Sequence, residues 1–325
     1  MDLPWRPVPF SDTADVGRVV AEFEAGATIV LQGLHLYWER LALFCRALEG
    51  ELDHPAQANA YFTPRDSQGL AVHHDTHDVF VLQVGGEKRW LVYEPVWPLP
   101  LREQRYRPEL GTRDEVAHDV TLRPGDTLYL PRGWLHEAVT SASDSLHVTV
   151  GINVYTWLDA FKAALKECAS DVAFRRAPDD GDAEALVQRL RARLSPEDVA
   201  RRRRARFVKT RRPILGRQVT QVRALDRLGM ETLVERRPTV LAELTGSGER
   251  VTLTFEGKEI VLPPHARSEA EFAAQAEEPF RPSDLPGELD AEGRLALVRR
   301  LVREGFLRLS EPDAPWPRSD GGAEP

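Results

Sequence analysis

Residues 69–83, GLAVHHDTHDVFVLQ, carry the pattern that decides the expected fold and chemistry of this chain. Side chains of a β-strand alternate between its two faces, so His73 and Asp75 are expected on one face and His74 on the other. One imidazole and one carboxylate on a common face supply two ligands of a 2-His-1-carboxylate facial triad, which leaves three neighbouring positions open on Fe(II). The stretch therefore predicts two of the three protein ligands of an iron site.

The third ligand has to come from a distant part of the chain, and His136 meets that requirement. It follows a turn at residues 131–133 (PRG), within the run DTLYLPRGWLHEA at residues 126–138. Turn signals on both sides of a short apolar run predict one strand before the turn and a second strand that carries His136. We therefore predict that His73, Asp75 and His136 hold one metal ion.

The other histidines near these residues are expected to do something else. His147, in LHVTV at residues 146–150, is the rival for the third ligand. The turn ahead of His136 favours His136, so His147 is expected to be buried and hydrogen-bonded. His77 shares strand parity with the first two ligands and is expected at the pocket mouth, as a substrate contact. His74 is expected to pack elsewhere or to lie at the surface.

Short strands are expected throughout the region around these residues. Between residues 57 and 153, runs rich in Val, Leu, Tyr and Trp alternate with turn signals such as GG at 85–86 and PGD at 124–126. Short strands at such spacing predict an all-β barrel or sandwich. Ahead of them, apolar residues at helical spacing predict a helix over residues 38–52.

The pattern becomes helical beyond residue 155. Residues 156–207 predict a helical connector, and the four arginines at 201–204 are interpreted as a solvated helix face or connector. Residues 208–312 predict a small domain with a hairpin over 251–262, a Pro- and Glu-rich loop over 263–286, and a helix that Asp290 begins and Gly305 ends. Helices with a β-wing favour a winged-helix module, and residues 313–325 are expected to be disordered.

Composition narrows the class of protein. No apolar run approaches the roughly 20 residues that span a bilayer, and the first residues lack the features of a signal peptide, which predicts a cytoplasmic protein with no membrane contact. Cys45 and Cys168 are far apart and are expected to be buried thiols. The net charge of −8 disfavours a large nucleic-acid interface.

Four stretches together resemble the JmjC/cupin-like ribosomal oxygenase family: residues 73–75 (HHD), 80–83 (FVLQ), 86–90 (GEKRW) and 128–137 (LYLPRGWLHE). The resemblance is close from about Asn59 to Asn153. It implies an α+β chain with a double-stranded β-helix, the JmjC/cupin jelly roll, over 1–155. A helical dimerisation segment over 156–207 and a winged-helix-like domain over 208–312 are expected to follow, in a homodimer.

The resemblance also implies an activity and a co-substrate site. It implies an Fe(II)- and 2-oxoglutarate-dependent dioxygenase that hydroxylates a histidyl or arginyl side chain of a ribosomal protein. Lys88 matches the position at which the family pairs a lysine with the distal carboxylate of 2-oxoglutarate, a task that suits a compact ammonium. Asn59 and Tyr61 match polar positions that contact the co-substrate, and Thr149 is expected to face the same pocket.

Two other classes of protein stay open at this point. One is a metal-dependent cupin enzyme that acts on a small molecule or a peptide natural product; such sites more often show His-x-His with a nearby Glu than His-x-Asp. The other is a ligand-sensing winged-helix regulator. A regulator needs a basic face for DNA, but residues 206–325 carry nearly equal numbers of basic and acidic residues.

Overall fold

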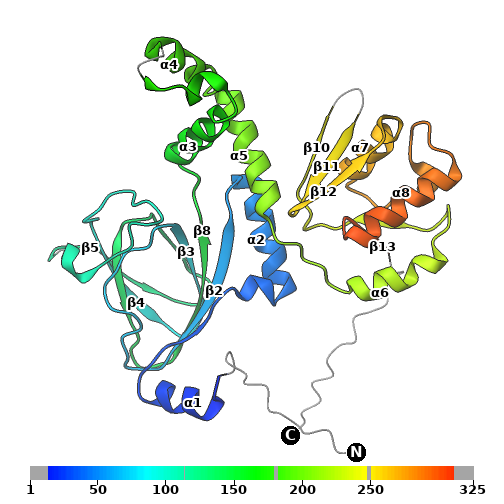
Figure 1. Ribbon diagram of the computed structural model, residues 1–325. Coiled ribbons are helices and arrows are strands. Elements are labelled where there is room, and N and C mark those ends of the chain that lie inside the picture. Colours follow the sequence, from blue (N-terminus) through cyan, green and yellow to red (C-terminus); the bar gives the residue numbers. More distant parts are fainter. Residues whose placement is uncertain (1–13, 113, 179–181, 247–249, 311–325) are drawn as a thin grey trace, which may run out of the picture. The chain divides into compact units, whose positions relative to one another are not determined.

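The computed structural model describes residues 14–112, 114–178, 182–246 and 250–310, which divide into two compact units (Figure 1). The first unit contains residues 14–48 and 54–154, and the second contains residues 49–53 and 155–310. The tail that is expected to be disordered, residues 313–325, lies outside the described residues. Among the helices described, none is both long and apolar enough to cross a membrane.

The strands of the first unit form two antiparallel sheets that enclose one interior (Figure 1). One sheet has the order β1-β2-β8-β3-β6 and the other has the order β5-β4-β7. Their bounds are β1 (Ile29–Leu31), β2 (Ala56–Thr63), β3 (Asp78–Gly85), β4 (Lys88–Tyr93), β5 (Val116–Leu122), β6 (Thr127–Leu130), β7 (Leu135–Val139) and β8 (Ser145–Ile152). The expected all-β architecture of this region is confirmed.

Strand β2 shows how the sequence sets the two faces of the larger sheet. Small apolar residues alternate along it, and Ala58 is fully buried on the face that packs against Cys45 of helix α2 (Glu39–Leu52). Tyr61 lies on the other face and lines the interior between the sheets. Side chains alternate along a strand with a period of two. Because the alanines of β2 pack against α2, its polar residues face the interior between the sheets.

One glycine is required where the chain turns into β7. Gly133 has φ +91°, and a Cβ atom there would lie 2.7 Å from the carbonyl oxygen of Trp97. Any other residue would be strained by the backbone angle and would also collide with the loop behind it. The turn delivers β7 beside β4, so that His136 pairs with Val92.

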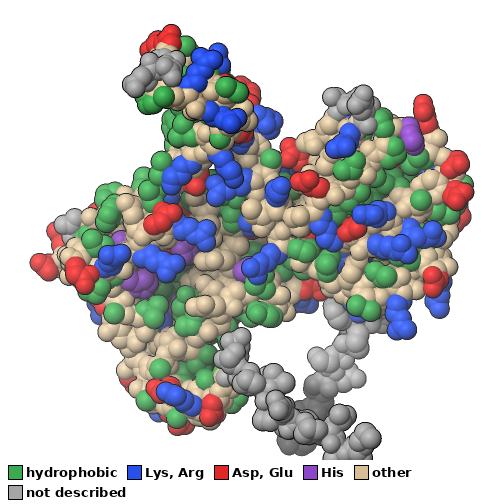
Figure 2. Space-filling view, in the orientation of Figure 1, with side chains coloured by type: hydrophobic (Ala, Val, Ile, Leu, Met, Phe, Trp, Pro, Cys, Tyr) green, Lys and Arg blue, Asp and Glu red, His purple; other side chains and the backbone are tan. Residues whose placement is uncertain are grey.

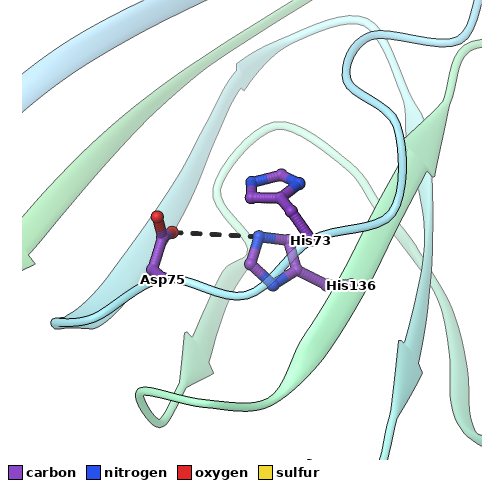
Figure 3. A group of neighbouring side chains, drawn as sticks. All are labelled: His73, Asp75 and His136. Atoms are coloured by element: carbon purple, nitrogen blue, oxygen red, sulfur yellow. Dashed lines mark ion pairs between the residues drawn. The ribbon is translucent and has the colours of Figure 1, made fainter. Parts of the chain in front are cut away.

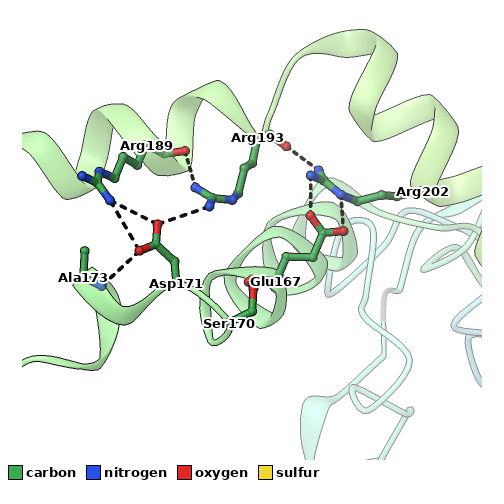
Figure 4. A network of polar contacts seen from close by, with 7 residues as sticks. All are labelled: Glu167, Ser170, Asp171, Ala173, Arg189, Arg193 and Arg202. Carbon is green, nitrogen blue, oxygen red and sulfur yellow. Dashed lines mark hydrogen bonds and ion pairs between the residues drawn. The ribbon is translucent and has the colours of Figure 1, made fainter.

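Ion pairs hold the helical part of the second unit together (Figure 4). It contains α3 (Trp157–Cys168), α4 (Ala183–Ala192) and α5 (Pro196–Thr210). Asp171 accepts hydrogen bonds from Arg189 at 3.3 Å and from Arg193 at 3.4 Å, while Glu167 binds two nitrogens of Arg202, each at 2.7 Å. Cys168 is buried at the end of α3, as expected.

The arginine run at residues 201–204 lies on helix α5 of the connector region, and its side chains are only partly solvated. Arg201 pairs with Asp198, and both Arg203 and Arg204 pair with Asp53. Arg202 retains 11% side-chain exposure. Arg202, Arg203 and Arg204 therefore pair with acidic residues from distant segments. The local sequence does not reveal these partners.

The C-terminal part of the second unit contains the expected hairpin and the expected last helix. Strands β11 (Val251–Phe255) and β12 (Lys258–Leu262) pair in register, and helix α8 (Ala291–Glu304) begins at Asp290, whose side chain accepts a hydrogen bond from the amide of Gly293. Gly305 ends this helix with φ +83°. The remaining elements are α1 (Val16–Glu24) in the first unit and, in the second, α6 (Gln218–Arg223), β9 (Val234–Arg236), β10 (Ala242–Thr245) and β13 (Leu307–Leu309).

The loop expected over residues 263–286 is wrong in part, because it contains helix α7 (Arg267–Gln275). Ala270 and Ala273 of this helix are fully buried in the C-terminal core. The flanking prolines indicated a loop, but burial of the two alanines favours a helix between them.

Candidate metal centre

Three side chains converge at one end of the interior of the first unit (Figure 3). One ligand atom from each of His73, Asp75 and His136 lies within 4.8 Å of the others. Nε2 of His136 is 3.9 Å from a carboxylate oxygen of Asp75, and the two imidazole rings are 4.4 Å apart between centroids. Two imidazole nitrogens and one carboxylate oxygen in this arrangement form the donor set of a facial triad for Fe(II).

The backbone around these side chains differs from the expected strand. Strand β3 begins only at Asp78, so His73 and Asp75 precede it, and the parity argument that placed both on one strand is wrong. His73 forms an isolated antiparallel bridge with His136. The backbone nitrogen of His73 lies 3.1 Å from the carbonyl oxygen of His136, and the nitrogen of His136 lies 2.8 Å from the carbonyl oxygen of His73. The carbonyl of Asp75 accepts a hydrogen bond from the amide of Gly133 at 3.0 Å. Pairing with β7 therefore positions His73, and the turn that precedes β7 positions Asp75.

Hydrogen bonds at the far ring nitrogens prepare both imidazoles for a metal. Nδ1 of His73 lies 2.8 Å from the carbonyl oxygen of Ala71, and Nδ1 of His136 lies 3.1 Å from that of Trp134. A carbonyl oxygen only accepts, so each Nδ1 carries the proton and each Nε2 keeps its lone pair. Such contacts fix the tautomer and the ring orientation of metal-binding histidines. Both histidines thus have the form that coordinates a cation.

Burial keeps His136 neutral. Its side chain is buried, and that burial, reinforced by His73, lowers the pKa of His136 to about 4. At neutral pH the imidazole is therefore unprotonated, which is the state a metal ligand requires.

Lys88 lies in the same interior and is buried without a carboxylate partner in the part of the chain that the structure describes. Its Nζ donates a hydrogen bond to Oγ1 of Thr63 at 2.8 Å, and Thr63 in turn lies 3.0 Å from Oγ1 of Thr28. Burial lowers the pKa of Lys88 to about 8. An ammonium that is buried beside hydroxyl groups is a receptor for an anion.

The other residues expected at the co-substrate site fall into two groups. Tyr61 and Thr149 line the same pocket as Lys88 and the three converging side chains. Asn59 is directed in part elsewhere, because its Oδ1 accepts a hydrogen bond from the amide of Gly33 at 2.8 Å. Burial, and then the nearby Asp75 carboxylate, raises the pKa of Tyr61, which keeps its hydroxyl protonated as a hydrogen-bond donor.

The remaining histidines take other places. His147 lines the pocket beside Lys88 and stacks on Tyr61, with ring centroids 5.0 Å apart. Burial, and then Lys88, lowers the pKa of His147 to about 3. It is buried as expected, but its Nδ1 has no hydrogen-bond partner among the described residues. His74 is buried and packs edge-on against Tyr106.

His77 rests on the backbone of β8. A Cβ atom at Gly151 would lie 2.4 Å from its ring, so only glycine fits beneath this imidazole. Figure 2 shows histidine side chains gathered on one side of the first unit. Trp90 and Gly69 are among the pocket residues that were not identified from the sequence; alternation along β4 from Lys88 to Trp90 was the signal for the first.

Part of this chain is similar in sequence to known proteins. The sequence model of the JmjC domain matches residues 37–160. The chain is 39% identical over 133 residues to a Drosophila persimilis protein named bifunctional lysine-specific demethylase and histidyl-hydroxylase NO66, and 42% identical over 123 residues to rat (Rattus norvegicus) ribosomal oxygenase 2. These alignments cover 41% and 36% of this chain, but only 19% and 25% of the relatives. The chain thus spans a quarter or less of their length.

Solved structures agree on the fold over a longer span. The Escherichia coli protein ycfD aligns with a TM-score of 0.54 at 19% identity, covering 87% of this chain and 79% of that one. A second structure of that protein, described as a ribosomal oxygenase in complex with cobalt and 2-oxoglutarate, aligns with a TM-score of 0.52 at 20% identity, covering 87% and 78%. The expected JmjC/cupin fold is therefore confirmed, and residues 37–160 match the JmjC domain.

Proposed function

We propose that this protein is an Fe(II)- and 2-oxoglutarate-dependent dioxygenase that hydroxylates a side chain of another protein. One observation carries the proposal: two histidines and an aspartate converge within 4.8 Å in a pocket that also holds a buried lysine without an acidic partner among the described residues. A metal triad and a separate cationic group in one pocket fit a co-substrate that chelates the metal at one end and carries a carboxylate at the other.

Each residue then has a defined task. His73, Asp75 and His136 hold Fe(II) and leave positions open for the co-substrate. Lys88, oriented by Thr63, binds the distal carboxylate of 2-oxoglutarate, with Tyr61, Thr149 and Asn59 as further polar contacts. When bound, iron and 2-oxoglutarate supply the oxidation of a C–H bond by O₂. The chain contributes a fixed geometry and a pocket with apolar walls that limits access of water.

The substrate class rests on the relatives. Their names include histidyl-hydroxylase and ribosomal oxygenase, which supports our inference that the target is a histidyl or arginyl side chain of a ribosomal protein. A cytoplasmic location is part of this proposal. A cupin enzyme for a small molecule or a peptide natural product is the alternative. The balanced charge of residues 206–325 still argues against a DNA-binding regulator.

Residues 156–207 are proposed to form the dimer contact of this enzyme, and residues 208–310 a winged-helix-like domain. Helix α3 leaves large apolar side chains exposed, with 68% exposure for Trp157, 44% for Phe161 and 52% for Leu165. Exposed aromatic and aliphatic residues at helical spacing are typical of a protein contact. Light scattering should give twice the chain mass, and Trp157→Glu with Phe161→Glu should give the single mass; a monomeric wild type would contradict this contact.

Binding under anaerobic conditions tests the enzyme proposal directly. Fe(II) with 2-oxoglutarate should give a weak visible charge-transfer band in the wild type. His73→Ala and His136→Ala should abolish the band, whereas Lys88→Ala should weaken 2-oxoglutarate far more than the metal. Unchanged 2-oxoglutarate affinity in Lys88→Ala would contradict the carboxylate assignment. Incubation with ribosomal proteins, followed by mass spectrometry for a gain of one oxygen atom, tests the substrate class.

A further inference from the structure

The segment that carries His73 and Asp75 lies along the edge of β7 in two different registers. Gln68 forms an isolated bridge with Val139, and His73 forms another with His136. Four residues separate the two bridge positions on the ligand segment, but only two separate them on β7. The ligand segment therefore absorbs two extra residues between its bridges, as a β-bulge does.

The extra residues lie against the lysine end of the pocket. Gly69 donates its amide hydrogen to the carbonyl oxygen of Ala138 at 3.2 Å, and a Cβ atom on Gly69 would lie 2.9 Å from Nζ of Lys88. Leu70 lines the pocket. A shift of the bulge by one residue would turn His73 away from His136 and would also push the chain against Lys88, because successive side chains alternate in direction.

Backbone hydrogen bonds to β7 flank the bulge at Gly69 and at His73, but among the described residues none comes from residues 70–72, and a side-chain link lies beside this gap. Nε2 of Gln68 donates to one carboxylate oxygen of Glu137 at 2.7 Å, and the hydroxyl of Tyr93 donates to the other oxygen at 2.6 Å. The carboxylate of Glu137 thereby joins the ligand segment, β7 and β4. The Glu137 hydrogen bond raises the pKa of Tyr93 to about 12, so the phenol remains protonated at neutral pH and can donate.

The link is on the opposite face of the β5-β4-β7 sheet from the metal ligands. Glu137 borders the pocket through its place on β7, but it follows His136 directly, and successive side chains alternate along a strand, so its carboxylate is directed to the other face. Glu137 pairs with Leu91, two residues before Tyr93 on β4, while His136 pairs with Val92. The carboxylate therefore acts on the metal site through the register of the backbone and not through contact with a ligand atom.

We propose that Glu137 is a positioning residue of the metal centre, whose carboxylate, held by Tyr93 and Gln68, sets the register in which His73 meets His136. This inference rests on the proposed metal site but makes a separate claim about it. Residues that orient metal ligands without touching the metal change metal affinity by about 10- to 100-fold when removed. A similar loss is expected here because the register decides whether all three donor atoms converge.

The same sheet offers a matched control. Asp119 on β5 pairs with Leu91 and binds Arg89, two residues before Leu91 on β4, at 2.8 Å and 2.5 Å. This pair repeats the geometry of Glu137 with Tyr93, on the other side of β4 and away from the ligand segment. Asp119→Ala removes a carboxylate of the same kind from the same face without affecting the ligand register.

The experiment measures Co(II) binding to this 325-residue chain by calorimetry and by the visible spectrum of the bound ion. Glu137→Ala should lower Co(II) affinity about 10- to 100-fold and alter the spectrum, because a displaced His73 changes the ligand geometry. Glu137→Gln, whose amide can still accept from Tyr93, should recover most of the affinity. Asp119→Ala should bind Co(II) as the wild type does.

The proposed role of Glu137 can be overturned by the following results. Wild-type affinity in Glu137→Ala, or an equal loss in Asp119→Ala, would overturn the inference, since a general loss of sheet stability would explain either result. If Glu137→Ala does not fold, Tyr93→Phe and Gln68→Ala each remove one contact, and both should weaken Co(II) by a smaller factor; unchanged affinity in both would also overturn it. Absence of Co(II) binding in the wild type would instead contradict the proposed metal site.

Discussion

The pKa of Lys88 predicts how 2-oxoglutarate binding depends on pH. Burial holds this pKa at about 8 in the free site, and the ammonium donates to Thr63 with no acid beside it in the described residues. In the proposed site the distal carboxylate of 2-oxoglutarate binds the ammonium and not the neutral amine, so we expect affinity to be highest well below pH 8 and to fall as the pH rises through 8. A site that requires one proton loses about tenfold in affinity between pH 7 and pH 9 when its pKa is about 8.

The assay is anaerobic calorimetry of 2-oxoglutarate into the Mn(II)-loaded protein at several pH values from 6.5 to 9. Lys88→Arg is the matched variant, because a guanidinium stays charged throughout this range and should flatten the profile. Pyruvate lacks the distal carboxylate and should show no corresponding fall in affinity. The buried histidines do not interfere, since the pKa values of His136 and His147 are lowered to about 4 and about 3.

Two results would refute this reasoning. A flat affinity for 2-oxoglutarate between pH 7 and pH 9 would mean that Lys88 is not the group that binds the carboxylate. An equal slope in Lys88→Arg would assign the pH dependence to another group.

Three further substitutions test other parts of the structure. Gly69→Ala places a methyl group 2.9 Å from Nζ, the flexible end of Lys88; because the lysine and not the bulge gives way, it should weaken 2-oxoglutarate on the order of tenfold in calorimetry, with Co(II) affinity retained. Phe255→Ala removes a fully buried ring that packs edge-on against Phe306, and should lower the free energy of unfolding of the second unit by about 3–5 kcal/mol in urea titrations. Arg202→Ala breaks a two-nitrogen contact with a half-exposed glutamate on α3 and should cost about 1 kcal/mol by the same titration; no change would mean that this pair is only a surface contact.

The sequence predicted which residues meet in the pocket better than how the chain brings them together. The identity of His73, Asp75 and His136 followed from residue type and turn signals, and the structure places one ligand atom of each within 4.8 Å of the others. The strand that was expected to carry the first two begins later, at Asp78. A strand and an edge segment that pairs through isolated bridges look alike in sequence, because both present polar side chains at a spacing of two.

The fold of the second unit shows a different limit of local patterns. The hairpin at 251–262 and the helix from Asp290 to Gly305 were predictable because turn and cap residues act over a few positions. Helix α7 was not, because its alanines become helical through burial against distant core residues. The ion pairs of the arginine run also come largely from acids far along the chain, so charge patterning did not reveal them.

The bulge ahead of His73 lies between the lysine end and the metal end of the pocket. Two extra residues allow the ligand segment to satisfy two demands, because Gly69 is brought against Lys88 while His73 still faces His136. A straight edge strand of the same composition would keep one register throughout and would meet only one of these demands. The co-substrate end and the metal end of the pocket are therefore coupled through four residues of backbone. For that reason, substitutions that move the bulge should change the affinities for metal and for 2-oxoglutarate together, whereas substitutions of Lys88 should change only the second.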